Sequence, residues 1–185
     1  MPLRTILKRA SNRGVFRRDP RGLATVEFAL VLPFTLVLFT GAIMYGDAIA
    51  IDRKVTLTTR TVTDLVTQVS TISQADLTTA MAASAQIVAP YSATPMTVTV
   101  SEVQTDSAGK ATVTWSQKYP SGAGRPKQQV IALPSTIDTA NATFILGEVT
   151  YTYTPAIGYR VTGPMTLSDQ TYMSPRVSAA IPLTP

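Results

Sequence analysis

The stretch RRDPRGLATVEFALVLPFTLVLFTGAIMYG, from Arg17 to Gly46, decides the organisation of this chain. Residues 23–46 carry one charge, on Glu27, and the 19 residues from 28 to 46 carry none. An α-helix rises about 1.5 Å per residue, so a helix of this length roughly matches the ~30 Å hydrocarbon core of a bilayer. We therefore predict a transmembrane helix over residues 23–46.

The basic character of the chain is confined to its start. The net charge of the 185 residues is +5, yet residues 1–22 alone hold seven bases and one acid. The rest of the chain has a slight excess of acids and offers no basic surface for gripping phosphates, so no nucleic-acid partner is expected. Bases directly before an apolar run hold an N-terminus in the cytoplasm, and we predict that residues 1–22 are a basic cytoplasmic leader.

Composition excludes most catalytic chemistry. The chain has no Cys and no His, which excludes disulfides, thiol chemistry, histidine general-base catalysis and the usual zinc sites. Its acids are scattered over unrelated predicted elements and form no carboxylate-pair motif. We therefore expect a protein that is not an enzyme, with no catalytic residues, no cofactor and no metal.

Residues 47–89 are predicted to be helical. Apolar residues recur at helical spacings at Val55, Val62, Leu65, Val66, Val69 and Ile72. The transmembrane helix is thus expected to continue as an amphipathic helix to about residue 69. Ser73, with Asp76 three residues later, has the spacing of a capping box, and the Ala-rich helix that follows must stop before Pro90. We expect these helices to form a periplasmic neck.

Residues 90–185 are predicted to form a small antiparallel sheet. Apolar and polar residues alternate on both sides of DSAGK (Asp106–Lys110), which predicts a hairpin with Gly109 at a positive φ. A long strand is expected within ATFILGEVTYTYTPAIG, a last short strand over TLSDQTYMSPRV (residues 166–177), and an exposed loop at residues 120–126. One face of the sheet must be covered, and the amphipathic helix is the candidate. The predicted fold class is α+β, with a long N-terminal helix, a second short helix and this sheet.

The aromatic residues of the sheet have two interpretations. Trp115, Tyr151 and Tyr153 could form a surface that stacks on a ligand, or they could lie in the core. Aromatic residues that alternate along a strand more often pack across strands or in a core. We predict that they belong to the core.

Glu27 is the informative residue of the apolar run. A carboxylate in a transmembrane helix costs about 2.5–3.5 kcal/mol at the centre and less near an interface, so a tolerated interfacial acid is one interpretation. A cut after Gly22 suggests another, because Leu23 would become the N-terminus and Glu27 the fifth residue. The freed α-amine of one copy would then pair with Glu27 of a neighbour, and each buried charge would have a partner.

The sequence RGLATVEFALVLPF resembles a class III signal sequence, the substrate of prepilin peptidase. More narrowly, residues 17–50 look like the N-terminal segment of TadE-like proteins of tight-adherence (Tad/Flp) pilus systems. The match lies in the Gly-x-x-x-Val-Glu-Phe-Ala-Leu-x-x-Pro run at Gly22–Pro33. Further on, YTYTP and MSPR are similar to C-terminal features of TadE-like and TadG-like chains.

The resemblance implies a pilin-like fold, cleavage between Gly22 and Leu23 by prepilin peptidase, and assembly through Glu27 and Phe28. It implies as partners other Tad pilins and minor pilins, the inner-membrane assembly platform and membrane lipid. The location implied is the bacterial inner membrane, single-pass with the C-terminal domain in the periplasm, followed by incorporation into the extracellular pilus. Major pilins of these systems are short, so the long region after residue 46 indicates a minor pilin or pseudopilin. Such a subunit would act in pilus initiation, assembly or tip formation, and so in surface adherence.

Two other interpretations of the N-terminal segment stay open. An uncleaved, signal-anchored TadG-like interaction protein of the same system would carry the same VEFALVLP run. Ordinary secretion would instead use the small-x-small triplet Ala48-Ile-Ala50, with signal peptidase cutting after Ala50.

Overall fold

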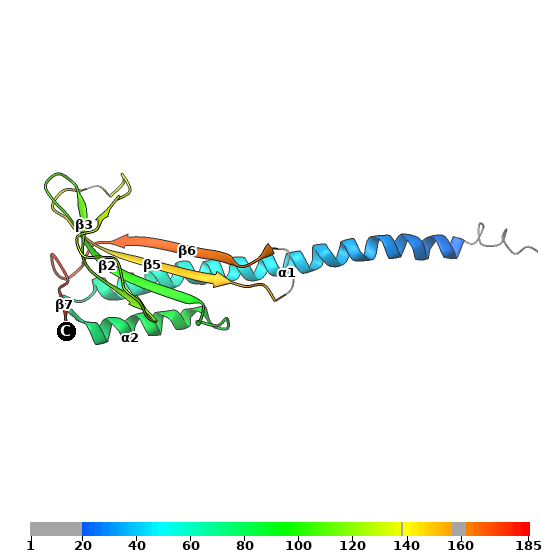
Figure 1. Ribbon diagram of the computed structural model, residues 1–185, viewed down its shortest axis with the longest axis horizontal. Helices are drawn as coiled ribbons and strands as arrows, with labels where there is room; N and C mark the ends of the chain where they lie inside the picture. Colours follow the sequence, from blue (N-terminus) through cyan, green and yellow to red (C-terminus); the bar gives the residue numbers. More distant parts are fainter. Residues whose placement is uncertain (1–19, 138, 157–161) are drawn as a thin grey trace, which may run out of the picture. The chain divides into compact units, whose positions relative to one another are not determined.

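The fold is α+β, with a long N-terminal helix, a short second helix and an antiparallel sheet, as the sequence predicts (Figure 1). The computed structural model describes residues 20–137, 139–156 and 162–185. Most of the leader predicted at residues 1–22 therefore lies outside the described residues. The chain divides into two compact units, Met1–Ile43 and Met44–Pro185.

The elements follow one another in a simple order. The helices are α1 (Pro20–Thr67), α2 (Gln74–Ala85) and the short 3-10 helix η2 (Gln86–Val88). The strands are β1 (Ile72–Ser73), β2 (Met96–Thr105), β3 (Ala111–Tyr119), β4 (Val130–Ile131), β5 (Thr143–Tyr153), β6 (Met165–Met173) and β7 (Leu183–Thr184).

The helix ends are encoded locally. Pro20 is the first residue of α1, where a missing backbone N–H costs nothing. The predicted cap of α2 is confirmed: the Ser73 hydroxyl accepts a hydrogen bond from the Asp76 N–H at 3.1 Å and donates one to the Asp76 carboxylate at 2.7 Å. Helical structure then ends with η2, ahead of Pro90, as expected.

The main sheet has five strands in the order β4-β3-β2-β5-β6, all antiparallel. The predicted hairpin joins β2 to β3, and Gly109 in its turn has a φ of 78°. The Asp106 carboxylate accepts the N–H groups of Ala108 and Lys110 at 2.8 and 2.9 Å, which fixes this turn. The register between β2 and β3 shifts between Glu102 and Val103, where Thr114 is the extra residue of β3. Because of this bulge, Trp115 of β3 faces the main core, whereas Ala111 packs in a second, smaller cluster with Val103 and Leu146.

One face of this sheet packs against the helices within residues 44–185. The amphipathic half of α1 contributes Ala48, Ile51, Val55, Val62 and Val66, and α2 contributes Leu77, Met81 and Ala85. Facing them from the sheet are Met96, Val98, Val100, Trp115, Ile145, Val149, Tyr151 and Tyr153. The aromatic residues therefore belong to the core, as predicted.

Strand β5 approaches α1 closely at one point. A Cβ atom on Gly147 would lie 1.9 Å from Thr63 Oγ1, so only glycine fits there without a shift. Thr63 itself is fully buried, and its hydroxyl donates to the Thr59 carbonyl at 2.7 Å. The pairing of a small strand residue with a buried threonine thus sets the spacing between helix and sheet.

The segment after β6 closes the compact unit. The last strand was predicted to extend to residue 177, but β6 ends at Met173 because Pro175 has no N–H to continue a ladder. The segment instead returns to the helices, where the Arg176 N–H donates to the Thr67 carbonyl at 2.9 Å. Strand β7 then pairs in parallel with β1, and Ile181 is fully buried in the core. We call residues 174–184 the closing segment.

Candidate functional site in the N-terminal helix

The first half of α1 presents apolar side chains all around the helix. Every residue from 23 to 39 is exposed, including Phe28 at 65%, Leu30 at 72% and Val37 at 69%. Consecutive exposed residues cover the whole circumference, so this surface is not one stripe of an amphipathic helix. Among the described residues, α1 over Leu23–Thr67 is the one helix long and apolar enough to cross a membrane.

The polar groups of this half are largely satisfied within the helix. The hydroxyl of Thr35 donates to the Val31 carbonyl at 3.0 Å, and that of Thr40 donates to the Leu36 carbonyl at 2.9 Å. A segment in hydrocarbon has no water to bond, so hydroxyls that bond to their own helix are compatible with that environment.

Glu27 and Phe28 lie on this exposed surface, close to the start of α1. Within the part of the chain that the structure describes, the Glu27 carboxylate makes no hydrogen bond or ion pair. The Gly22–Leu23 peptide bond lies in the first turns of α1, and Leu23 is 63% exposed. Glu27 follows Leu23 by four residues, so the two occupy the same side of the helix.

Three other acids of the compact unit have structural partners. Asp64 pairs with Arg176, the Asp76 carboxylate accepts the hydroxyl of the α2 cap Ser73, and Asp106 fixes the hairpin turn. In the described ranges no three acidic side chains come close enough together to hold a metal ion. Asp138 lies outside the described residues.

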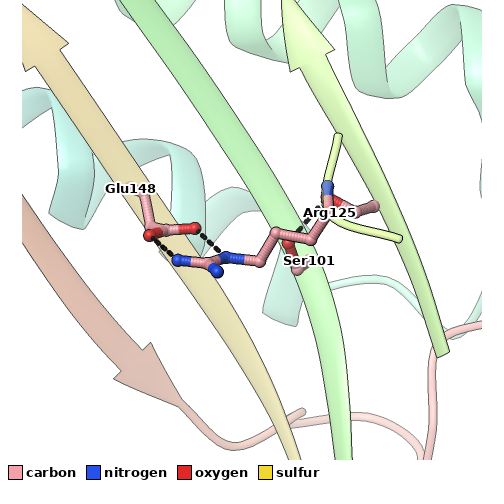
Figure 2. Close-up of polar contacts among 4 residues, drawn as sticks. Ser101, Arg125 and Glu148 are labelled. Atoms are coloured by element: carbon pink, nitrogen blue, oxygen red, sulfur yellow. Dashed lines mark hydrogen bonds and ion pairs between the residues drawn. The ribbon is translucent and has the colours of Figure 1, made fainter. Parts of the chain in front are cut away.

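A polar network on the other face of the sheet was not anticipated from the sequence. Arg125 reaches across the strand that carries Ser101 and meets Glu148 (Figure 2). Its Nε and Nη2 atoms donate to the two carboxylate oxygens of Glu148 at 2.7 and 2.6 Å. The Ser116 hydroxyl accepts the Arg125 backbone N–H at 2.9 Å and bonds with the Ser101 hydroxyl at 2.8 Å. The hydrogen bonds that Arg125 donates to Glu148 raise the pKa of Arg125 further, so this guanidinium stays charged.

Loop residues 120–126 were predicted to be exposed, and most of them are. Arg125 and Gly124 are the half-buried exceptions. A Cβ on Gly124 would lie 2.4 Å from Ser116 Oγ, so the glycine allows the loop to rest on β3 and deliver Arg125. The glycines of PSGAGRP were the sequence signal for this close approach.

A second unanticipated feature is the buried carboxylate of Glu102, which is 2% exposed. Its Oε1 atom accepts the Ile181 N–H at 2.6 Å, and Trp115 Nε1 donates to the Ile181 carbonyl at 2.8 Å. Glu102 and Trp115 are cross-strand partners, so two neighbouring side chains hold both backbone groups of one residue in the closing segment. Burial raises the pKa of Glu102, although the hydrogen bond from the Ile181 N–H and the neighbouring Trp115 indole oppose the rise.

No family model, characterised protein or solved structure matches this chain in comparisons of sequence and structure.

Proposed function

We propose that this protein is a membrane-anchored minor pilin or pseudopilin of a Tad-type pilus, held by the first half of α1. The observation that carries the proposal is that the apolar run ends almost where the compact unit begins. The uncharged apolar run ends at Gly46, and the compact unit with a core of its own begins at Met44. A segment exposed on all sides and a self-sufficient folded unit are the two parts that a bitopic subunit needs.

The distribution of charge favours one orientation of this anchor in the membrane. The bases of residues 1–22 precede the span and would stay in the cytoplasm, which sends residues 47–185 to the periplasm. In a filament, the same apolar surface would pack against helices of neighbouring subunits, so it would stay out of water before and after extraction from the bilayer. The partners are then prepilin peptidase, other Tad pilins and the inner-membrane assembly platform.

Gly22, Leu23, Glu27 and Phe28 carry the proposed maturation and assembly. Cleavage after Gly22 would give Leu23 a positively charged amine at the start of the helix. Glu27 of a neighbouring subunit would accept that amine, and Phe28 would pack beside it. Exposure of all three mature residues supports this proposal, because each side chain is available to a second molecule.

The alternative is an uncleaved, signal-anchored TadG-like protein of the same system, which would use the same span without the cut. Secretion by a cut after Ala50 is disfavoured, because that bond lies inside α1 within the compact unit. Such a cut would remove the buried Ala48 and the Asp47 carboxylate that accepts the Tyr91 hydroxyl at 3.1 Å.

Intact mass and N-terminal sequencing of the protein from its native membrane test the proposal. A chain that starts at Leu23 supports prepilin processing, whereas one that keeps the leader supports the uncleaved anchor. A start at Ile51 would contradict both. Gly22→Trp should block cleavage. Glu27→Ala should be trimmed normally but incorporate poorly into pili, and normal piliation by this variant would refute the proposed role of Glu27.

A further inference from the structure

The two edges of the five-stranded sheet differ in their protection. The outer edge of β3 is covered at residues 111–113 and at Gln117 by residues 123–131. The contacts are the pairing of Ala111 and Thr112 with β4, the bonds of Val113 with Gln128 and Gln129, and the bridge from Gln117 to Ala123. This edge is therefore closed to another strand.

Strand β6 forms the opposite edge, and no segment in the part of the chain that the structure describes covers it in this way. Within the described ranges, its nine residues pair with β5 alone, in an unbroken register. It contains no Pro or Lys and has no bulge, so of the usual devices that protect an edge it has one, the central charge of Asp169. A long, regular edge of this kind is a template for an added strand.

Hydrogen bonds fix which backbone groups of β6 point outward. Thr152 of β5 donates its N–H to the Pro95 carbonyl, on the side of β2. Since bonding alternates along antiparallel strands, the even-numbered residues of β5 bond toward β2, and their partners in β6 point away from the sheet. These outward residues are Thr166, Ser168, Gln170 and Tyr172. In agreement, the Gln170 N–H bonds to the side chain of Asp169, at 2.9 Å.

Asp169 lies at the centre of β6 and carries its one charge. It shares the helix-side face of the strand with Met165, Leu167, Thr171 and Met173. In a centred antiparallel pair of two β6 strands, each Asp169 would face its own copy, and like charges directly opposite are destabilising. A basic residue opposite Asp169 would instead form a cross-strand ion pair, while the partner's carbonyl could take over the Gln170 N–H.

We propose that β6 is a strand-addition site for an extended segment of another protein, with apolar residues flanking a central Lys or Arg on one face. Main-chain bonds to Ser168 and its outward neighbours supply the affinity, and Asp169 selects the charge of the partner. This site does not depend on membrane anchoring or on the proposed function.

Binding of synthetic strands to the full-length protein in detergent micelles tests the proposal. The probe is a nine-residue peptide with four Val and a central Lys on one face and Thr on the other, N-methylated at the amides that point away from β6 to prevent self-association. Its partner probe has Glu in place of Lys. The Lys peptide should bind about tenfold more tightly than the Glu peptide, and Asp169→Lys should reverse this order.

Two variants separate edge binding from loss of fold. Ser168→Pro removes an outward N–H without touching the β5 ladder, and it should abolish binding of the Lys peptide while the fluorescence of the buried Trp115 stays unchanged. Asp52→Lys, which reverses the charge of an exposed residue of α1, should leave the preference for the Lys peptide over the Glu peptide unchanged. Failure of both peptides to bind the wild-type protein, equal binding of the two, or full binding to Ser168→Pro would overturn the proposal.

Discussion

The two halves of α1 make opposite use of the same secondary structure. Residues 23–43 are rich in Leu, Val and Phe, and they are exposed on every side. Residues 44–67 contain six threonines and yet supply one wall of a core. Four of those threonines are fully buried: Thr58, Thr59, Thr63 and Thr67. The more apolar half is thus the exposed one, which shows that apolar content alone does not decide burial in this chain.

The threonines explain how a less apolar surface can be buried. Each buried hydroxyl donates to a carbonyl of its own helix, at distances of 2.7–2.9 Å, so no donor is left without a partner. Their small side chains also allow β5 to come close at Gly147. In contrast, the large residues of the first half suit a surrounding of lipid tails or neighbouring helices, which need no matched groove.

The largest expected effect distinguishes buried from exposed positions in the second half. Val55→Asp would place an unpaired charge at a fully buried site, and we expect a loss of about 3–5 kcal/mol in the free energy of unfolding. Leu57→Asp is the matched control, because Leu57 is 54% exposed. Thermal unfolding followed by Trp115 fluorescence in micelles measures both. Equal destabilisation by the two variants would contradict the described burial.

The next effect concerns the first half. Leu36→Arg puts a charge near the middle of the apolar run, at a cost of about 2.5–3.5 kcal/mol for membrane insertion. The variant should be released from membranes by alkaline extraction, whereas unfolding of residues 44–185 should stay as in the wild type. Leu57→Arg, with the same substitution in the second half, should remain in the membrane. Retention of the Leu36→Arg variant in the membrane after alkaline extraction would refute the proposed transmembrane segment.

A smaller effect tests the close approach of helix and sheet. Gly147→Ala would bring a Cβ against Thr63 Oγ1, and we expect a loss of about 1–3 kcal/mol in the free energy of unfolding. Gly41→Ala is the control in the other half, where a Cβ would meet no atom within 4 Å. Addition of Thr63→Ser, which keeps the hydroxyl, should not relieve the clash, but Thr63→Ala should. Chemical denaturation of the four variants measures these differences.

The smallest expected effect concerns the buried carboxylate of Glu102 rather than the surfaces of α1. The pKa of Glu102 is raised by burial, so the folded state holds its proton more tightly than the unfolded state does. Its contribution to stability is therefore present at low pH and is lost as the pH rises through the folded pKa. Glu102→Gln keeps an acceptor for the Ile181 N–H without the charge, and it should raise the Tm at pH 7.

That gain should shrink as the pH is lowered toward the ordinary range of a glutamate. Glu102→Ala serves as the control, because it leaves the Ile181 N–H buried without an acceptor and should lower the Tm at every pH. A Tm gain in Glu102→Gln that does not depend on pH would contradict the assigned titration.

Periodic and local signals carried the part of the fold that the sequence could predict. The helical structure of the apolar run, the cap at Ser73 and the hairpin at Gly109 each depend on the local sequence, and all three are confirmed. Strands β1 and β7 have two residues each, which is too short for any alternation to be read. Their pairing depends on the tertiary fold instead.

The contacts of Arg125 with Glu148 and of Glu102 with the closing segment were not predicted either, because they too depend on the tertiary fold. Glu148 and Glu102 are acids in the middle of strands, and their isolated sequence context is that of solvent-facing residues. Register brings Arg125 to Glu148 and a distant backbone N–H to Glu102, across separations of 23 and 79 residues. The roles of Gly22 and Glu27 stay predictions, since they concern a peptidase and a neighbouring subunit.

The closing segment has a consequence for the timing of biogenesis. Ile181 completes the core from a position 79 residues beyond Glu102, and Arg176 binds Asp64 across 112 residues. Helix α1 emerges from the ribosome long before either contact is possible. If the first half of α1 is the membrane anchor proposed above, residues 44–173 would wait outside the membrane with the core still open until residue 181 is translocated. Under that proposal, completion of the fold would be tied to completion of export.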